Sequence, residues 1–178
     1  MSSRVALLRS INVGGNNKIA MPALSALFTT LGHTDVRTYI QSGNVIFRPR
    51  DGSLDAGRLE SELEQAIQKS FNLAVRVLTR THDQLREVER HNPFPDAEPE
   101  RLMVVFLRDA PGPEQIAALD PNRSPPDTFV VRGREIYAFC PNTFAKTKLT
   151  LDWFERRLGA VGTARNWRTV GVLAGMSV

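Results

Sequence analysis

The sequence predicts an α+β fold made of two ferredoxin-like halves of the βαββαβ type, with mostly antiparallel sheets and an extra C-terminal helix. Three observations lead to this prediction. Strand and helix patterns follow the order βαββαβ over residues 1–80, a proline-rich stretch follows at residues 91–99, and a similar order of elements returns over residues 101–178. We detect no residue-level repeat between the halves, and a single fused, antiparallel-rich α+β sheet is equally consistent with the pattern.

The first half begins with a strand and a helix. Apolar residues fall at i, i+3, i+4 and i+7 from Leu24 to Leu31, Pro22 suits a first helical turn, and Gly32 provides a stop. Residues 41–44 are typical of a hairpin turn between two strands. The expected strands cover residues 5–9, 36–40, 45–48 and 74–78, and the expected helices cover residues 21–31 and 54–69.

A short helix and a linker connect the halves. Thr81 with Gln84 forms a capping-box pattern for a helix that ends near Arg90. Three prolines and several acids then make residues 91–99 the best linker candidate. We therefore expect one domain over residues 1–178, with an N-terminal half at 1–80, a connecting helix and linker at 81–100, and a C-terminal half at 101–178.

The second half is expected to have the order βαββα plus a terminal helix. Leu102–Leu107 is continuously apolar, as in a strand covered on both faces. Residues 132–134 form a second hairpin signal. The expected strands cover residues 102–107, 129–131 and 135–139, and the expected helices cover residues 113–119, 149–158 and 166–174.

Composition points to a soluble globular protein with a sizeable core. The chain has 178 residues, of which 42% are hydrophobic, and its mean hydropathy is -0.24. No apolar run is long enough to span a bilayer, and the single Cys140 excludes an intrachain disulfide, so we expect a cytoplasmic protein. His33, His82 and His91 share no metal-ligand spacing. We therefore expect no membrane segment, no metal site and no cofactor.

Positive charge gathers at the two ends of the chain. The net charge is +4, from 23 Lys and Arg against 19 Asp and Glu. Residues 1–50 hold six bases and one acid, residues 146–178 hold six bases and two acids, and the middle holds 11 bases and 16 acids. If the ends meet in space, they form one basic face that attracts phosphate groups or polyanions. The alternative is ordinary surface charge that keeps the protein soluble.

The stretch from Leu7 to Lys18 carries the clearest sign of a site. A buried-strand pattern stops there, and a polar loop with a glycine pair and flanking cations follows. Paired glycines let backbone N–H groups turn outward, and the surrounding side chains add donors suited to an anion or a carbonyl-rich ligand. A strand-to-helix turn that needs positive φ explains the glycines and asparagines equally well, since no phosphate-loop or dinucleotide motif is present. The candidate ligand-binding residues here are Arg9, Asn12, Gly14, Gly15, Asn16 and Lys18.

The turn at residues 41–44 supplies three more candidates, Gln41, Ser42 and Asn44. The amides of Gln41 and Asn44 are candidates to line the same site as the first loop. Ordinary hairpin chemistry is the alternative explanation for Gly43 followed by asparagine. In addition, the loop after the first strand and the hairpin between the second and third often lie at opposite ends of a ferredoxin-like sheet, which argues against a joint site.

Two segments near the C-terminus add Lys148, Arg165 and Asn166 as candidates. Lys148 precedes a helix, where the helix dipole disfavours a lysine unless an anion docks there. Arg165 is suited to clamp a carboxylate or phosphate with two parallel hydrogen bonds. The alternatives are a solvated lysine and a structural pair between Arg165 and an acid that ties the last helix to the body.

Four segments together resemble a known family. They are LLRSINVGGNNKI at residues 7–19, VRTYIQSGNV at 36–45, KLT at 148–150 and TARNW at 163–167. They look like the signature of a bacterial family known only as a domain of unknown function, number sixteen ninety-seven in that series, over about residues 3–175. The family pattern usually reads Arg-Gly-Ile-Asn and Lys-Ile-Pro-Met where this chain has Ser10 and Ala20. The resemblance implies a duplicated ferredoxin-like α+β fold and supplies no activity, substrate or cofactor.

These observations support three hypotheses of function. The first is a cytoplasmic binding protein whose basic face, built from both terminal regions, takes a phosphate-bearing ligand, either a nucleotide or a nucleic acid. The second is an enzyme that acts on a small anionic metabolite, with Lys18 or Lys148 as an acid–base or electrostatic group inside a closed cleft. The third is a structural or interaction module in which the motifs are turns, caps and contacts between the halves.

Overall fold

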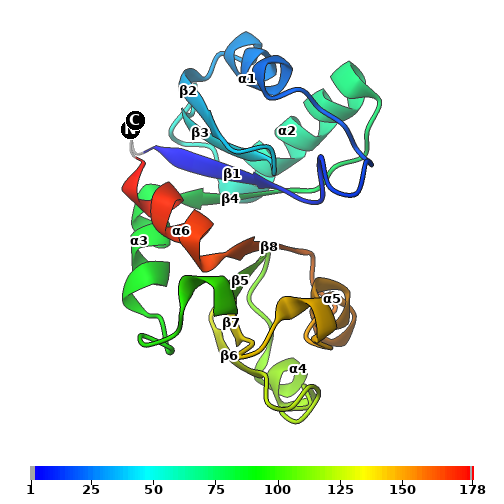
Figure 1. Ribbon diagram of the computed structural model, residues 1–178. Helices are drawn as coiled ribbons and strands as arrows, with labels where there is room; N and C mark the ends of the chain where they lie inside the picture. Colours follow the sequence, from blue (N-terminus) through cyan, green and yellow to red (C-terminus); the bar gives the residue numbers. More distant parts are fainter. Residues whose placement is uncertain (1–2, 177) are drawn as a thin grey trace. The chain divides into compact units, whose positions relative to one another are not determined.

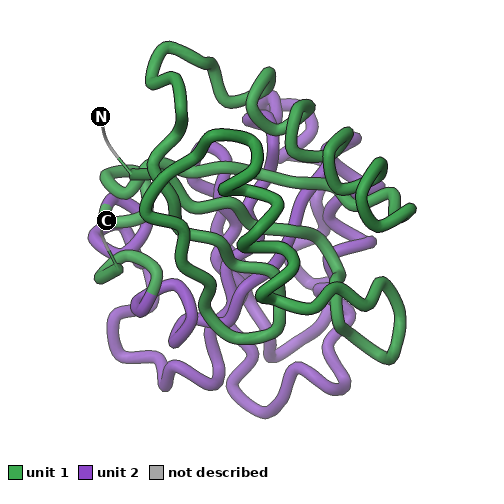
Figure 2. The backbone as a smooth tube through the Cα atoms, turned by 90° about the horizontal axis from the view of Figure 1, so that it is seen from above, with its two compact units in different colours: residues 1–86, 173–178 green, residues 87–172 purple. Residues whose placement is uncertain are grey.

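The computed structural model describes residues 3–176 and residue 178. The chain forms two compact units, unit 1 with residues 1–86 and 173–178, and unit 2 with residues 87–172 (Figure 2). Each unit contains a four-stranded antiparallel sheet (Figure 1). The predicted α+β fold with two ferredoxin-like halves and a C-terminal helix is confirmed, and the two separate sheets exclude the single fused sheet. The linker boundaries at residues 81–100 stay a prediction.

Unit 1 has the element order β1–α1–β2–β3–α2–β4 and the sheet order β2-β3-β1-β4. The elements span Arg4–Leu8 (β1), Met21–Thr30 (α1), Thr34–Tyr39 (β2), Asn44–Arg48 (β3), Ala56–Phe71 (α2) and Val77–Thr81 (β4). Helix α1 packs against β2, and α2 packs against β4; both helices cover the same face of the sheet (Figure 1). The core between them includes Phe28, Phe47 and Leu63, which are fully buried.

Local signals explain where the helices of unit 1 begin and end. The Asp55 side chain accepts the N–H of Arg58 at 2.9 Å and so starts α2, and Asn72 ends that helix in the left-handed region. The capping box predicted for α3 (His82–Arg90) is confirmed. Thr81 N–H donates to Gln84 Oε1 at 2.9 Å, and Gln84 N–H donates to Thr81 Oγ1 at 3.2 Å.

Unit 2 repeats the same topology, with the sheet order β6-β7-β5-β8. Its elements, after a short 3₁₀ turn at Pro99–Arg101 (η1), span Leu102–Leu107 (β5), Pro113–Ala117 (α4), Thr128–Arg132 (β6), Glu135–Phe139 (β7), Phe144–Lys146 (a 3₁₀ turn, η2), Leu151–Leu158 (α5) and Gly162–Asn166 (β8). The C-terminal helix, Trp167–Gly175 (α6), begins in unit 2 and ends in unit 1. A core that includes Val105, Trp153 and Phe154 lies in this unit. The order βαββα expected for this half was wrong by one element, because the expected order did not include strand β8. This short strand lies at a sheet edge and pairs only with β5, so it shows no long apolar pattern.

The strand registers reveal a residue-level correspondence between the units. The last residue of β1, Leu8, pairs with Val77 at the start of β4, and the last residue of β5, Leu107, pairs with Gly162 at the start of β8. An arginine follows each of the leucines in the chain. In unit 1 this arginine's N–H donates to Arg76 O, and in unit 2 it donates to Val161 O, both at 2.8 Å. The halves therefore share a framework that aligned sequence letters do not reveal.

Within the described residues, no helix combines the length and the apolar character that a membrane crossing requires.

Candidate functional site

The loop between β1 and α1 folds into a miniature hairpin. Asn12 N–H donates to Asn17 O, and Asn16 N–H donates to Val13 O, both at 3.1 Å. Gly14 and Gly15 form the tip with φ of 60° and 80°. Two successive left-handed residues are what a tight two-residue hairpin requires, and glycine adopts them without strain. The tip is exposed, and a Cβ added at either glycine would meet nothing within 4 Å.

The side chain of Asn12 holds the base of this hairpin in place. Its Oδ1 accepts the N–H of Ile19 at 2.8 Å, and its Nδ2 donates to Ile19 O at 2.9 Å. The same Nδ2 also donates to Gln41 O at 2.9 Å. Asn12 therefore joins the two ends of its own loop and ties that loop to the β2–β3 turn.

The β2–β3 turn lies at the same end of the sheet as the β1–α1 loop. The sequence argument that placed these two segments at opposite ends was wrong, because β3 runs antiparallel to β1 and its first residue, Asn44, pairs with Leu7 near the end of β1. The turn is tightly joined to the loop at Gly43. Leu8 N–H donates to Gly43 O at 2.9 Å, and a Cβ at Gly43 would lie 2.8 Å from Leu8 Cβ and from Ile11 Cγ1.

These two segments border an open pocket of about 430 Å³. Its lining residues are Asn12, Gly15, Lys18, Ile19, Ala20 and Gln41. Lys18 is exposed and makes no ion pair or side-chain hydrogen bond with any residue that the structure describes. Ala20 is the residue before α1, and no side chain caps that helix start. The pocket therefore combines one available ammonium group with an uncapped helix N-terminus.

The other candidates of unit 1 take varied positions. Asn44 is fully buried, and its Nδ2 donates to Tyr39 O and to Ser42 Oγ, both at 3.1 Å. Arg9 is half-buried, and Asn16 is exposed at the hairpin. Asn44 and Ser42 therefore shape the turn from within, whereas Asn16 is open to solvent.

The other cations of the basic N-terminal region are largely engaged within unit 1. Arg48 pairs with Asp35 at 3.0 Å, and Arg50 pairs with Glu62 at 2.9 Å. Arg4 Nη2 donates to Leu54 O at 3.1 Å. Arg48 and Arg50 are therefore paired with acids, whereas Lys18 and Arg37 are exposed cations without an ion pair among the described residues, and of these two Lys18 lines the pocket.

The C-terminal candidates belong to unit 2. Lys148 is exposed, and its backbone N–H donates to Ser124 Oγ at 3.0 Å. Arg165 lies on β8 and is buried; its Nη1 donates to Thr163 Oγ1 and to Ala164 O, both at 2.8 Å. Burial lowers the pKa of Arg165 to about 10, so the group stays cationic at neutral pH. Asn166 caps α6 by accepting the N–H of Thr169 at 2.8 Å.

The β1–α1 loop has a much shorter counterpart in unit 2. The connection between Leu8 and Met21 has 12 residues, whereas the corresponding connection between Leu107 and Pro113 has five. The two units share strand order and register. The extra residues of unit 1 are therefore not needed to close a unit of this topology.

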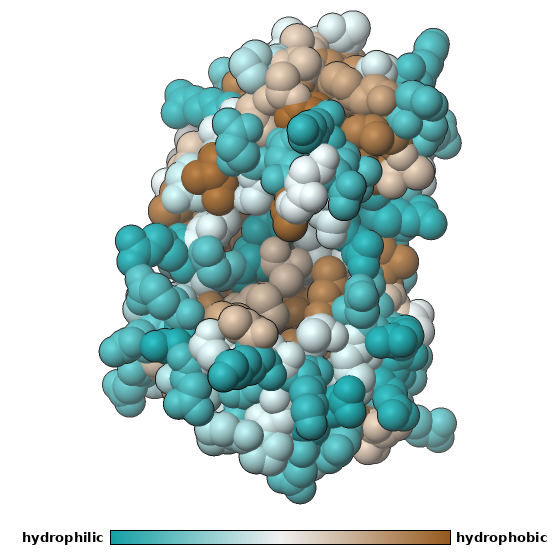
Figure 3. All heavy atoms as spheres, turned by 45° about the vertical axis from the view of Figure 1, so that its right-hand side comes forward, coloured by the Kyte–Doolittle hydropathy of each residue, from teal (hydrophilic) through white to brown (hydrophobic). Residues whose placement is uncertain are grey.

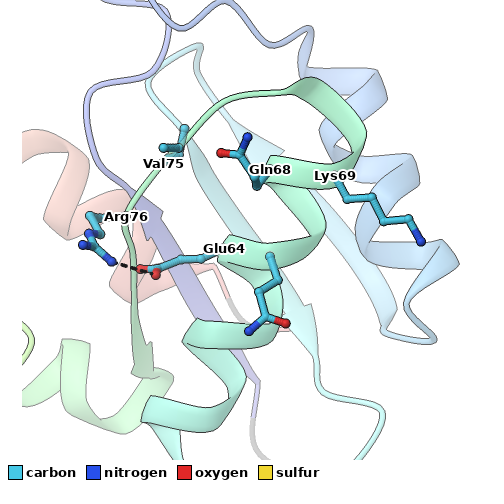
Figure 4. Close-up of a pocket in the computed structure, with 7 residues that line it drawn as sticks. Glu64, Gln68, Lys69, Val75 and Arg76 are labelled. Carbon is cyan, nitrogen blue, oxygen red and sulfur yellow. Dashed lines mark hydrogen bonds and ion pairs between the residues drawn. The ribbon is translucent and has the colours of Figure 1, made fainter.

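A second concavity of unit 1, of about 440 Å³, lies between α2 and the segment before β4 (Figure 4). Glu64 is engaged there, since its Oε2 pairs with Arg76 Nη1 at 3.3 Å and its Oε1 accepts the N–H of Val77 at 2.9 Å. Lys69 is exposed and points away from this pair (Figure 4). The charged pair at this concavity is internally matched, which leaves the exposed Lys69 as its remaining charged lining residue.

Sequence reasoning missed Val13 and Ile40, which adjoin the pocket. Each is a large hydrophobic residue that is exposed, Val13 at 59% and Ile40 at 49%. Ile40 also has a φ of 49°, which branched residues rarely adopt. For Ile40, the sequence did contain a signal of exposure. This isoleucine directly precedes the polar hairpin turn at residues 41–44, and turns usually lie at the surface.

Residues 1–137 match the family described as "Protein of unknown function (DUF1697)". The chain belongs to the DUF1697 family. The resemblance to this family is therefore confirmed over residues 1–137, which contain the first two of the four sequence segments. The glycine of the family pattern at position 10 also has a structural reason, since Ser10 has a φ of 55°.

Among solved structures, this DUF1697 chain is similar to "conserved bacterial protein SP0830 from Streptococcus pneumoniae". The two chains are 23% identical, and the match covers 98% of this chain and 97% of the other with a TM-score of 0.75. That likeness establishes the shared fold. No curated protein matches the chain.

Proposed function

We propose that this chain is a binding protein for a phosphate-bearing ligand, which it holds at the pocket between the β1–α1 loop and the β2–β3 turn of unit 1. The difference in loop length between the units carries this proposal. The connection between the first strand and the first helix has five residues in unit 2 but 12 residues in unit 1. The longer connection of unit 1 borders the pocket. Loops that a rigid scaffold positions are where binding residues concentrate.

The chemistry of the pocket supports an anionic ligand. The Lys18 ammonium is exposed and has no partner among the described residues, so it is available to a phosphate oxygen. Ala20, the residue before α1, lines the same pocket, so the positive end of a helix dipole lies beside it. Asn12 is committed to Ile19 and Gln41, so its role in this proposal is to position the loop. A nucleotide or a nucleic acid end would supply the phosphate.

The exposure of the lysines favours binding over catalysis. Lys18 and Lys148 are both exposed, and the enzyme hypothesis needs one of them enclosed in a cleft that excludes water. The contacts of Arg165 and Asn166 with their own strand and helix assign these two residues to the structure of unit 2 in our proposal. That a single basic face also contains Lys148 stays a prediction.

A titration with Lys18→Ala tests the proposal. We expect a panel of nucleotides and short oligonucleotides to include at least one binder, and Lys18→Ala to weaken it by about tenfold. Lys69→Ala is the matched control, because Lys69 is an exposed lysine of the same unit at the other concavity. Binding by an oligonucleotide should weaken steeply with salt, since phosphate contacts release counterions. Equal effects of the two substitutions, or no binder in the panel, would contradict the proposal.

A further inference from the structure

Two exposed hydrophobic residues are chain neighbours of residues that line the pocket at Lys18. In the described part of the chain, Val13 and Ile40 are the large hydrophobic residues that are exposed. The visible face in Figure 3 is covered mostly by hydrophilic residues, with hydrophobic ones in smaller groups between them. Val13 follows Asn12 and Ile40 precedes Gln41, and a hydrogen bond of 2.9 Å joins Asn12 Nδ2 to Gln41 O. The two hydrophobic residues therefore adjoin two lining residues that touch each other.

The backbone at this place is unusually bent. Seven of the twelve positive-φ residues of the described part lie in the β1–α1 loop and the β2–β3 turn. Ile40 is the β-branched member of this set, and a left-handed conformation is unfavourable for such a residue. The fold recovers little of this cost by burying the side chain, which is half exposed. Strained backbone conformations that burial does not compensate are common at ligand-binding sites.

We infer that the ligand is a nucleoside monophosphate, whose base lies against Val13 and Ile40 while its phosphate meets Lys18. This inference rests on the proposed function. Two exposed hydrophobic residues beside a pocket with one available cation suit a small molecule with one planar apolar end and one anionic end. The pocket volume of about 430 Å³ lies within the usual range for small-molecule sites. One ammonium group is matched by one phosphate rather than by a polyphosphate chain.

Three probes and three variants test the inference by isothermal titration calorimetry. The probes are inorganic phosphate, ribose 5-phosphate and adenosine 5′-monophosphate. Val13→Thr keeps the side-chain shape and the β preference of the hairpin, and Ile40→Asn places a residue that tolerates positive φ. Lys18→Ala removes the cation that is expected to bind the phosphate group of all three probes. Melting temperatures of the variants verify that each one folds.

The nucleotide should bind about tenfold more tightly than ribose 5-phosphate, because only the nucleotide covers the apolar surface. Val13→Thr and Ile40→Asn should each weaken the nucleotide about fivefold and leave ribose 5-phosphate within twofold. If the nucleotide and ribose 5-phosphate bind with equal affinity, and Lys18→Ala weakens the binding of both, the proposed function holds. The inference that the base contacts Val13 and Ile40 is then wrong. If Lys18→Ala weakens none of the probes, the proposed function fails and this inference fails with it.

Discussion

Arg80 and Arg165 hold the same position in the two sheets of this protein. Arg80 pairs with Val5 on β1, and Arg165 pairs with Val104 on β5, three residues after the start of each final strand. Both side chains are buried. Arg80 Nη1 donates to Thr79 O at 2.9 Å, and Arg165 Nη1 donates to Ala164 O at 2.8 Å. From this shared geometry we propose a structural role for both arginines.

The first prediction follows from this equivalence. We expect Arg80→Ala and Arg165→Ala each to lower the free energy of unfolding by about 3 kcal/mol, because each change leaves buried acceptors without their donor. Urea denaturation measures this loss. Arg168→Ala is the control, since that arginine is exposed and its change should cost less than about 1 kcal/mol. An Arg165→Ala variant that keeps its stability and loses phosphate binding would refute the structural role.

The second prediction concerns Gly43, which joins the β2–β3 turn to the β1–α1 loop. Gly43→Ala should lower the free energy of unfolding by about 3 kcal/mol, since the new Cβ would lie 2.8 Å from Leu8 and Ile11 at a φ of 80°. Gly133→Ala should cost about 1 kcal/mol, because Gly133 has a φ of 60° and open space around it. Thermal and urea unfolding measure both variants. Equal losses would mean that the turn and the loop are not packed as described.

The third prediction separates positioning from binding in the β1–α1 loop. Asn12→Ala removes the hydrogen bonds to Ile19 and Gln41 and should cost about 2 kcal/mol of unfolding free energy. Asn16→Ala should cost less than about 0.5 kcal/mol, because that side chain is exposed. Hydrogen exchange of the Ile19 amide reports the same contact, and its protection should fall in Asn12→Ala. Unchanged protection there would show that Asn12 does not hold the loop.

The fourth prediction is a pH dependence of stability that originates at His33. This residue is buried beside Phe28 and Phe47, and its Nδ1 accepts the N–H of Arg50 at 3.1 Å. Burial, helped by the nearby Arg50 cation, lowers the pKa of His33 below its usual value of 6.5. Below pH 6.5 the unfolded chain therefore binds a proton that the folded chain excludes, so stability falls as the pH drops toward the folded pKa.

His33→Asn provides the comparison for this effect, because the asparagine oxygen can also accept the Arg50 N–H. Between about pH 7.5 and about pH 5.5, the parent should lose more unfolding free energy than His33→Asn. Chemical denaturation at several pH values measures both slopes. Parallel slopes would show that His33 does not contribute to the pH dependence.

Much of the fold was predictable because its signals are local. The helix from Met21, the capping box at Thr81 and Gln84 and the apolar strand at Leu102–Leu107 follow from spacing and caps within a few residues. Strand β8 was not predictable in this way. It is a short edge strand with an arginine inside, and only its pairing with β5 makes it a strand.

The candidate site was predictable in part. The glycine pair and Lys18 stand out in the sequence and lie together at one loop. The contact between Asn12 and the carbonyl of Gln41 depends on the direction of β3 relative to β1, which no local pattern reveals. The exposure of Val13 and Ile40 likewise depends on how the chain leaves the sheet. Long-range geometry therefore decides which of the polar and apolar residues meet.

The most direct test of the central claim is a ¹⁵N–¹H NMR titration of the protein with adenosine 5′-monophosphate. The account predicts that the amide shifts are largest at Gly14, Gly15, Lys18 and Gln41, and that they disappear in Lys18→Ala but not in Lys69→Ala. Shifts that are largest in the short connection at residues 108–112, or around Lys148, would contradict a site at the unit 1 loop.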